Sequence, residues 1–318
     1  MTHFDVFNGD ADGICSLLQL RLAAPGESVL VTGAKRDITL LQRVPAQRGD
    51  TVTALDISAA NNREALLALL ERGVAIQYFD HHFAGELPAH PGLEAHIDTS
   101  PSVCTGILVD RHLAGSQRIW AVVAAFGDNL IAAARDLAAS IKLAPTQIAA
   151  LRELGDNIAY NAYGDSETDL IVPPAELYLS LKNHADPFRF IATEALFGKL
   201  SEARRDDLDR ARQIKPEANA ANARIYVLPD APWARRVRGV FGNELANASP
   251  DAAHAILTGS AQDGYTVSVR APRTNPRGAD ALCRRFATGG GREAAAGINR
   301  LPASELPAFV RSFVQAFP

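Results

Sequence analysis

The chain has 318 residues, 47% of them hydrophobic, and a net charge of -4, a composition typical of globular proteins and sufficient for two buried cores. Acidic residues begin at Asp5, before any long apolar run, and Asp128 interrupts the apolar stretch 119–131, so we expect no signal peptide, no membrane span and a cytoplasmic location. Three widely separated cysteines without a C-x-x-C spacing support neither a disulfide framework nor a zinc knuckle.

Charge is distributed unevenly along the chain. Residues 224–318 contain 12 Arg, no Lys and 7 acidic residues, a net charge of +5, whereas residues 1–223 contain 20 basic and 29 acidic residues, a net charge of -9. An acidic segment concentrates metal ions, and guanidinium groups suit paired hydrogen bonds to phosphate. We therefore expect metal binding in the first part of the chain and phosphate contacts in the second.

The first part alternates short apolar runs with helical patterns. Strands are predicted at residues 4–7, 28–32, 51–57 and 74–79, and helices at 14–23 and 60–72. This alternation predicts an α/β fold with a doubly wound, mostly parallel sheet, whose ligands bind beyond the C-terminal ends of the strands.

The pattern becomes helical from about residue 119 to residue 200, and a charged helix follows at 201–212. The second part predicts strands at 225–228, 253–259 and 264–270, and helices at 233–246, 279–287 and 303–316, the last two flanking a glycine-rich turn. We expect a catalytic domain at 1–200, a helical linker at 201–222 and a smaller α/β domain at 223–318.

Four acidic stations follow predicted structural elements, and we expect all four at strand ends. They are Asn8-Gly9-Asp10-Ala11-Asp12-Gly13, Asp56, Asp80-His81-His82 and Asp128. Carboxylates and imidazoles that converge from several strand ends are able to hold two divalent cations about 3.5 to 4 Å apart, a spacing suited to phosphoester hydrolysis. Taken singly, Asp10 or Asp12 is better explained as a turn or N-cap residue, and His82 as a packed core histidine, but five such residues in this order favour a metal site.

These motifs resemble those of the DHH family of phosphoesterases, which includes RecJ-like nucleases, oligonucleotide phosphodiesterases and polyphosphatases. The resemblance covers nearly the whole chain. Its matching segments are the four stations, Ser102-Val103-Cys104-Thr105-Gly106, Thr266-Val267-Ser268-Val269-Arg270 and Gly289-Gly290-Gly291-Arg292-Glu293-Ala294-Ala295-Ala296-Gly297. The last two segments look like the DHH-associated C-terminal domain.

The predicted metal ligands are Asp10, Asp12, Asp56, His81 and Asp128, with Asp56 bridging two ions and Asn8 as a weaker ligand. This mixed oxygen and nitrogen set suits Mn²⁺ and tolerates Mg²⁺, and the resemblance also implies manganese. We expect the catalytic residues to be His82, which contacts the phosphate, and its partner Asp80. The hypothesis is in-line attack on phosphorus by a water activated by both metals.

Basic and glycine residues are the predicted substrate contacts. Arg270 matches the family's Ser-x-Arg, and Arg292 stands where the family usually has a histidine. The complete set is Lys35, Arg36, Arg238, Arg270, Gly289, Gly290, Gly291 and Arg292. Thr105 and Ser102 are predicted only to cap a helix that begins near Gly106.

The resemblance implies an Mn²⁺-dependent phosphodiesterase that hydrolyses linear dinucleotides, such as pGpG, or very short oligonucleotides to mononucleotides. The alternatives are an exopolyphosphatase or pyrophosphatase, and a nucleotide-binding protein with a decayed site. Modest length and the absence of a strongly basic channel argue against long duplex nucleic acid as a partner. We expect no membrane partner, and a homodimer is compatible with the sequence.

Overall fold

The computed structural model describes residues 1–220, 222–260 and 264–318. The chain divides into two compact units, Met1–Glu202 and Ala203–Pro318. The predicted domain limits, with 201–222 as linker, stay a prediction, and residue 221 lies outside the described residues. No helix in the described ranges is both long enough and apolar enough to span a membrane.

The first unit is built on a parallel sheet with the strand order β2-β1-β3-β4-β5. The strands are β1 (His3–Phe7), β2 (Val29–Val31), β3 (Thr51–Leu55), β4 (Ala75–Asp80) and β5 (Leu93–Ile97). The predicted doubly wound parallel sheet is confirmed. Strand β5 was not predicted, because Glu94 and His96 interrupt its apolar pattern.

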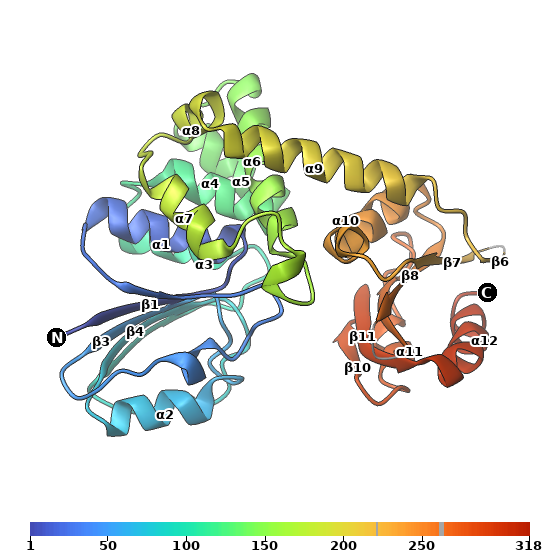
Figure 1. Cartoon of the computed structure of the whole chain (residues 1–318), viewed down its shortest axis with the longest axis horizontal. Coiled ribbons are helices and arrows are strands. Elements are labelled where there is room, and N and C mark those ends of the chain that lie inside the picture. The colour runs from blue at the N-terminus through green and yellow to red at the C-terminus, as the bar shows by residue number, and fades with distance from the viewer. Residues whose placement is uncertain (221, 261–263) are drawn as a thin grey trace. The chain divides into compact units, whose positions relative to one another are not determined.

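Helices cover both faces of this sheet. In Figure 1, α1, α3, α4 and α7 lie on one side of the sheet and α2 on the other. The helices of the unit are α1 (Ala11–Ala23), α2 (Arg63–Glu71), α3 (Thr105–His112), α4 (Arg118–Gly127), α5 (Ile131–Ser140), α6 (Pro145–Ala162), α7 (Pro174–Lys182), α8 (Pro187–Thr193) and α9 (Ala195–Arg212, which continues into the second unit), with 3-10 turns at Leu40–Arg43 and Glu167–Asp169.

The two faces bury separate hydrophobic clusters because side chains alternate along each strand. On β4, Ile76 and Tyr78 pack in the cluster that contains Leu66 of α2, whereas Phe79 packs in the larger cluster that contains Trp120 of α4. The alternation therefore fixes which face of the sheet each side chain packs against.

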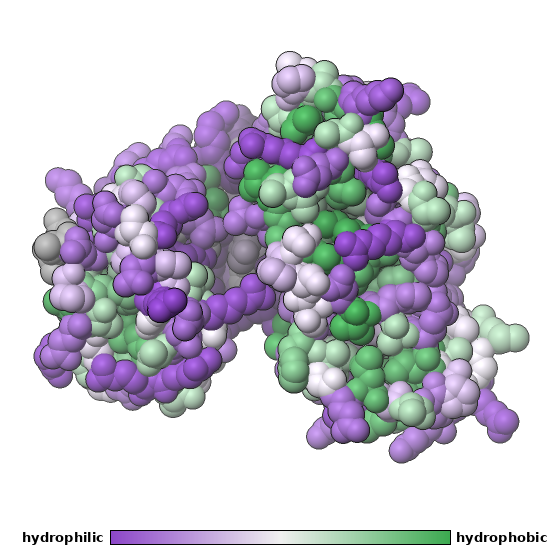
Figure 2. All heavy atoms as spheres, turned by 180° about the vertical axis from the view of Figure 1, so that it is seen from behind, coloured by the Kyte–Doolittle hydropathy of each residue, from purple (hydrophilic) through white to green (hydrophobic). Residues whose placement is uncertain are grey.

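The second unit contains a mixed sheet with the strand order β10-β11-β9-β8-β7-β6. Its elements are β6 (Ala218–Ala220), β7 (Ala223–Leu228), α10 (Pro232–Ala248), β8 (Ala253–Ser260), β9 (Gly264–Arg270), α11 (Ala279–Cys283), β10 (Gly289–Arg292), β11 (Ala295–Pro302), a 3-10 turn at Ala303–Glu305 and α12 (Leu306–Ala316). The smaller α/β unit is confirmed. Figure 2 views the chain from behind Figure 1 and shows that hydrophilic residues cover much of the surface on this side, with hydrophobic residues in patches between them.

The predicted glycine-rich turn is wrong. Residues 289–292 are strand β10, which pairs antiparallel with β11. A side chain at Gly289 would place Cβ 1.7 Å from the Cys283 carbonyl oxygen, and Gly291 has φ 137°. The glycines therefore permit close packing and a left-handed residue within a hairpin.

Candidate metal centre

The turn after β1 places the first two carboxylates. Asp10 is the N-cap of α1, and its Oδ1 accepts hydrogen bonds from the backbone N–H groups of Asp12 (3.0 Å) and Gly13 (3.2 Å). The Asn8 Oδ1 accepts from the Asp10 N–H at 3.2 Å. A Cβ at Gly13 would lie 2.1 Å from the Asn8 carbonyl oxygen. The N-cap and the glycine thus hold Asp12 in the first helical turn, at the strand end.

Asp12 is fixed by a second helix. Its Oδ2 accepts from the Thr105 N–H at 2.8 Å, and its Oδ1 accepts from the Gly106 N–H at 2.7 Å, both in the first turn of α3. A carboxylate is favoured at a helix N-terminus, where N–H groups lack partners within the helix. The expected side-chain cap from Thr105 or Ser102 is wrong, since the carboxylate of Asp12 makes these contacts instead.

Asp56 follows β3 in an unusual backbone conformation. Its φ is 58°, in the left-handed region, while its N–H still donates to the Phe79 carbonyl at 3.0 Å. Its Oδ1 accepts from the Thr105 hydroxyl at 3.2 Å. Non-glycine residues adopt this conformation at an energetic cost, and such strain concentrates at functional sites.

The orientation of His81 suits metal binding. Its Nδ1 lies 3.0 Å from the Val103 carbonyl oxygen, so Nδ1 carries the proton and Nε2 presents a lone pair. Around this Nε2 lie carboxylate oxygens of Asp56 at 3.5 Å, Asp12 at 3.8 Å and Asp128 at 3.9 Å. Donors that share one cation at about 2.1 Å lie roughly 3 to 4 Å apart.

His82 is held by the residue that ends β4. Asp80 is fully buried, and its Oδ1 accepts from the His82 Nδ1 at 2.8 Å. Burial lowers the pKa of His82, but the hydrogen bond and charge of Asp80 outweigh that effect and raise it. The His82 side chain remains 41% exposed, so its Nε2 is accessible to a ligand.

The expected strand-end position of Asp128 is wrong. Asp128 is the C-cap of α4, because the preceding apolar residues follow a helical rather than an alternating pattern. Packing of α4 against α1 brings this helix end to the strand ends. Its carboxylate thereby reaches His81.

Side chains from these stations line one cavity of about 230 Å³, whereas the buried Asp12 and Asp80 are not among its lining residues. Ligand atoms of Asp56, His81 and His82 lie within 4.8 Å of one another. The lining residues are Asn8, Asp10, Lys35, Ile38, Asp56, Ile57, Ser58, Asn61, His81, His82 and Asp128. The structure therefore brings residues from all four predicted stations together.

Crowded negative charge governs the electrostatics of this cavity. Burial, followed by the charges of Asp12 and Asp10, raises the pKa of Asp56 well above its ordinary value. Burial and the charge of Asp12 raise the pKa of Asp128 to about 6. Burial also acts to raise the pKa of Asp10, but the ammonium of Lys35 lowers it to about 2. Bound cations relieve such repulsion, so the donor set fits divalent metal.

Lys35 and Arg36 lie on the same segment but have different partners. The Lys35 ammonium pairs with Asp10 Oδ2 inside the cavity, while the Lys35 carbonyl accepts from the Asn8 amide at 3.3 Å. Arg36 pairs with Asp165, which does not line the cavity. Asn8 thus has a structural role in this loop, and its role as a metal ligand stays a prediction.

The remaining predicted substrate residues belong to the second unit. Arg270 donates to Asn243 Oδ1 at 2.7 Å, to Ser268 Oγ at 2.9 Å and to the Gly239 carbonyl at 3.4 Å, so much of its guanidinium has protein partners. Arg292 is exposed at the end of β10, whose first residues are Gly289, Gly290 and Gly291. Arg238 lies within α10.

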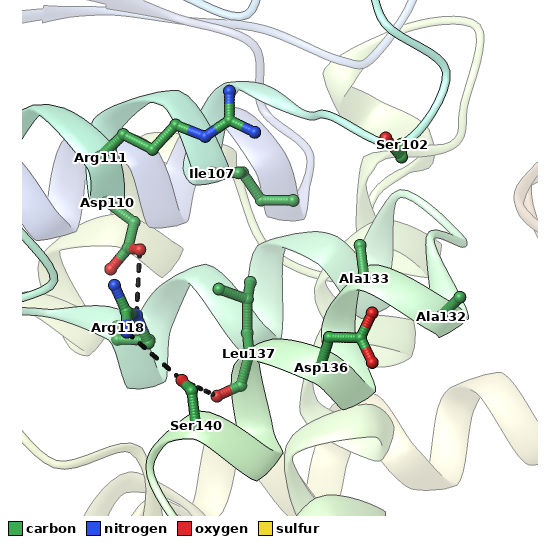
Figure 3. A pocket seen from close by; sticks show the side chains of 10 residues that line it. All are labelled: Ser102, Ile107, Asp110, Arg111, Arg118, Ala132, Ala133, Asp136, Leu137 and Ser140. Carbon is green, nitrogen blue, oxygen red and sulfur yellow. Dashed lines mark hydrogen bonds and ion pairs between the residues drawn. The ribbon is translucent and has the colours of Figure 1, made fainter.

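A larger cavity of about 480 Å³ lies between α3 and α5 (Figure 3). Two of its charged groups pair with each other, since Arg118 donates to Asp110 at 3.1 Å, and Arg118 also donates to Ser140 at 3.3 Å. The predicted catalytic residues do not line it.

No family model and no curated protein matches the chain. Solved structures match its fold throughout. A DHH domain protein, described as a member of a family of ribosomal proteins, has a TM-score of 0.69 at 13% identity, covering 99% of this chain and 86% of that one. The exonuclease RecJ bound to manganese has a TM-score of 0.64 at 20% identity, covering 100% and 91%. The chain has the fold of RecJ-like DHH proteins.

A third structure with this RecJ-like DHH fold is PggH from Vibrio cholerae, a pGpG-specific phosphodiesterase. Its TM-score is 0.58 at 13% identity, and the match covers 99% of both chains. Because these identities are between 13% and 20%, the matches establish the fold alone.

Sequence reasoning missed three features of the site. The Thr105 hydroxyl contacts Asp56, the α3 N-terminus holds Asp12, and Ser58, Asn61 and Ile38 line the cavity. The motif containing Thr105 is visible in the sequence, but no local pattern indicates a contact across 49 residues.

Proposed function

We propose that this chain is a divalent-metal-dependent phosphodiesterase that hydrolyses linear dinucleotides such as pGpG, or very short oligonucleotides, to mononucleotides. The observation that carries this proposal is the convergence of three carboxylates on Nε2 of His81. The structural match to a pGpG-specific phosphodiesterase over 99% of both chains supports the choice of substrate.

We propose that Asp10, Asp12, Asp56, His81 and Asp128 would hold divalent metal, with Asp56 the candidate ligand to both of two ions. Carboxylate and imidazole donors suit Mn²⁺ and accept Mg²⁺, and the structurally similar RecJ is bound to manganese. When bound, such ions lower the pKa of water and offset charge on phosphoryl oxygens.

The protein's own cations complete the phosphate site. With its Nδ1 held by Asp80, His82 is oriented to donate from Nε2 to a phosphoryl oxygen. The ammonium of Lys35 stands beside Asp10 in the same cavity and attracts a second phosphoryl oxygen. Both groups act by stabilising negative charge that grows during the reaction.

We propose substrate contacts in the second unit as well. The guanidinium of exposed Arg292 is accessible to phosphate, and open space around Gly290 admits close approach to the backbone. Arg238 and Arg270 contribute positive charge near the same sheet, on α10 and β9.

Product chromatography tests the function. Purified protein with Mn²⁺ is incubated with pGpG, a mixed-sequence dinucleotide, a longer oligoribonucleotide and polyphosphate, and Asp56→Asn protein serves as the blank. Release of GMP from pGpG by wild-type protein, and none by Asp56→Asn protein, supports the proposal. Consumption of polyphosphate alone would establish the exopolyphosphatase alternative, and tight nucleotide binding without hydrolysis would indicate a decayed site.

A further inference from the structure

Apolar side chains stand at the edge of the charged cavity. Five large hydrophobic side chains are exposed in the described part of the chain: Met1, Val29, Ile38, Phe83 and Leu179. Ile38 lines the cavity and is 43% exposed, and Phe83 directly follows His82 and is 78% exposed. One of the five therefore lines the cavity, and another is the sequence neighbour of the histidine that we assign to the phosphate.

The segments that carry these two side chains are held firmly by one buried amide. Asn62 is 1% exposed, and its Nδ2 donates to the Ile38 carbonyl at 2.7 Å and to the Ser58 carbonyl at 3.0 Å. Its Oδ1 accepts from the Leu41 N–H at 3.1 Å. The Ser58 hydroxyl in turn donates to the Phe83 carbonyl at 2.8 Å. Hydrogen bonds thus link the backbones of both apolar residues to the buried Asn62, directly for Ile38 and through Ser58 for Phe83.

This arrangement gives the cavity two chemically different parts. One part contains the carboxylates, His82 and Lys35, which suit metal and phosphate. The other contains the aliphatic Ile38 and Ser58, whose hydroxyl donates to the Phe83 carbonyl, and the exposed Phe83 ring stacks on no other ring within the described residues. A phosphate chain offers nothing to such a surface, whereas a nucleotide carries a flat base next to its phosphate.

We propose that Phe83 and Ile38 form a nucleobase subsite, in which Phe83 stacks on the base of the nucleotide whose phosphate lies at His82. This inference rests on the proposed phosphodiesterase function. It makes Phe83 a specificity-determining residue that favours nucleotides over phosphate chains without a base. Stacking on an aromatic ring tolerates every base and strengthens binding by about one to two powers of ten. Asn61, which also lines the cavity, supplies an amide for the edge of the base.

The test compares substrates with and without bases. Phe83→Ala and Phe83→Trp proteins are assayed on pGpG and on an abasic dinucleotide with the same phosphate backbone. We expect kcat/KM for pGpG to fall about tenfold in Phe83→Ala, mainly through KM, and to be retained in Phe83→Trp, while abasic hydrolysis is unchanged in both. Leu179→Ala removes another exposed apolar side chain, on α7, and serves as the matched control.

A second measurement does not depend on hydrolysis. Fluorescence of Phe83→Trp protein is titrated with GMP and with ribose 5-phosphate, and we expect only GMP to quench the new indole. Absence of quenching, or equal losses on both dinucleotides in Phe83→Ala, would overturn the base subsite even if the enzyme hydrolyses pGpG. Quenching by GMP without any hydrolysis would retain the subsite and reject the proposed function. Loss of self-association in Phe83→Ala, with unchanged kinetics, would assign the ring to a protein interface and overturn the proposal.

Discussion

Substituting Asp80 by Asn isolates the role of charge behind His82. Asp80 is fully buried, its Oδ1 accepts from His82 Nδ1, and its Oδ2 has no hydrogen-bond partner within the described residues. An Asn side chain has the same shape and still offers an oxygen to His82, but it lacks the negative charge that favours protonated imidazole. Its nitrogen takes a position that already lacks a partner, so the added cost to folding is small.

Changing the carboxylate partner of a functional histidine costs about 10- to 100-fold in activity. We therefore expect kcat of Asp80→Asn on pGpG with saturating Mn²⁺ to fall by that factor, equivalent to about 1.4 to 2.7 kcal/mol. KM should change little, because the charge of His82 matters most when negative charge develops on the phosphate.

Steady-state kinetics and thermal melting of the same preparations check this expectation. Asp98→Asn is the matched control, since Asp98 follows β5 and accepts from Ser100 and Arg111 outside the cavity. Wild-type turnover in Asp80→Asn, or an equal loss in both variants, would refute the assigned role of Asp80. A fall in Tm large enough to unfold the protein at the assay temperature would instead make Asp80 a structural residue.

Chelation should abolish pGpG hydrolysis and added Mn²⁺ should restore it; full activity after dialysis against EDTA would contradict the metal assignment. Lys35→Met leaves Asp10 without its ammonium partner, so Mn²⁺ should raise the Tm of this variant more than that of wild type, as differential scanning fluorimetry would show. Gly13→Ala should lower the free energy of unfolding by several kcal/mol, measured by urea titration, because its Cβ would lie 2.1 Å from a carbonyl oxygen. Burial acts to raise the pKa of Asp5, but hydrogen bonds led by that from Arg21 lower it below its ordinary 3.8, so its carboxylate stabilises the fold above that pH and this contribution is lost as the pH falls through the lowered value. Asp5→Asn should accordingly be about 3 kcal/mol less stable than wild type at pH 7, and urea titrations should show a smaller difference below pH ~4.

Much of the fold was predictable because, in the first unit, short apolar runs alternate regularly with helical patterns along the sequence. The acidic stations after β1, β3 and β4 follow from that reading, since parallel strands end at the same edge of a sheet. The edge strand β5 was missed because Glu94 and His96 interrupt its apolar pattern. This strand belongs to the sheet through its pairing with β4, and no local sequence pattern reveals that pairing.

The site was less predictable than the fold where its contacts are long-range. Asp128 was expected at a strand end, yet it reaches the cavity through the packing of α4 on α1. Glycines 289–291 looked like a turn, because a strand without side chains has no periodic pattern to read. Phe83 carries no motif at all, and only its exposure beside His82 distinguishes it.

The pair of hydrogen bonds between Asp12 and the start of α3 joins residues 93 and 94 positions apart in the chain. During synthesis the carboxylate of Asp12 emerges long before the amide groups that orient it. Until Thr105 and Gly106 have left the ribosome, the first motif has its loop but not its aligned ligand. Closing so long a loop is entropically costly and is repaid only as the surrounding core forms. Formation of the proposed metal centre is therefore coupled to folding of this unit, and we expect a nascent chain to bind metal tightly only after α3 has docked.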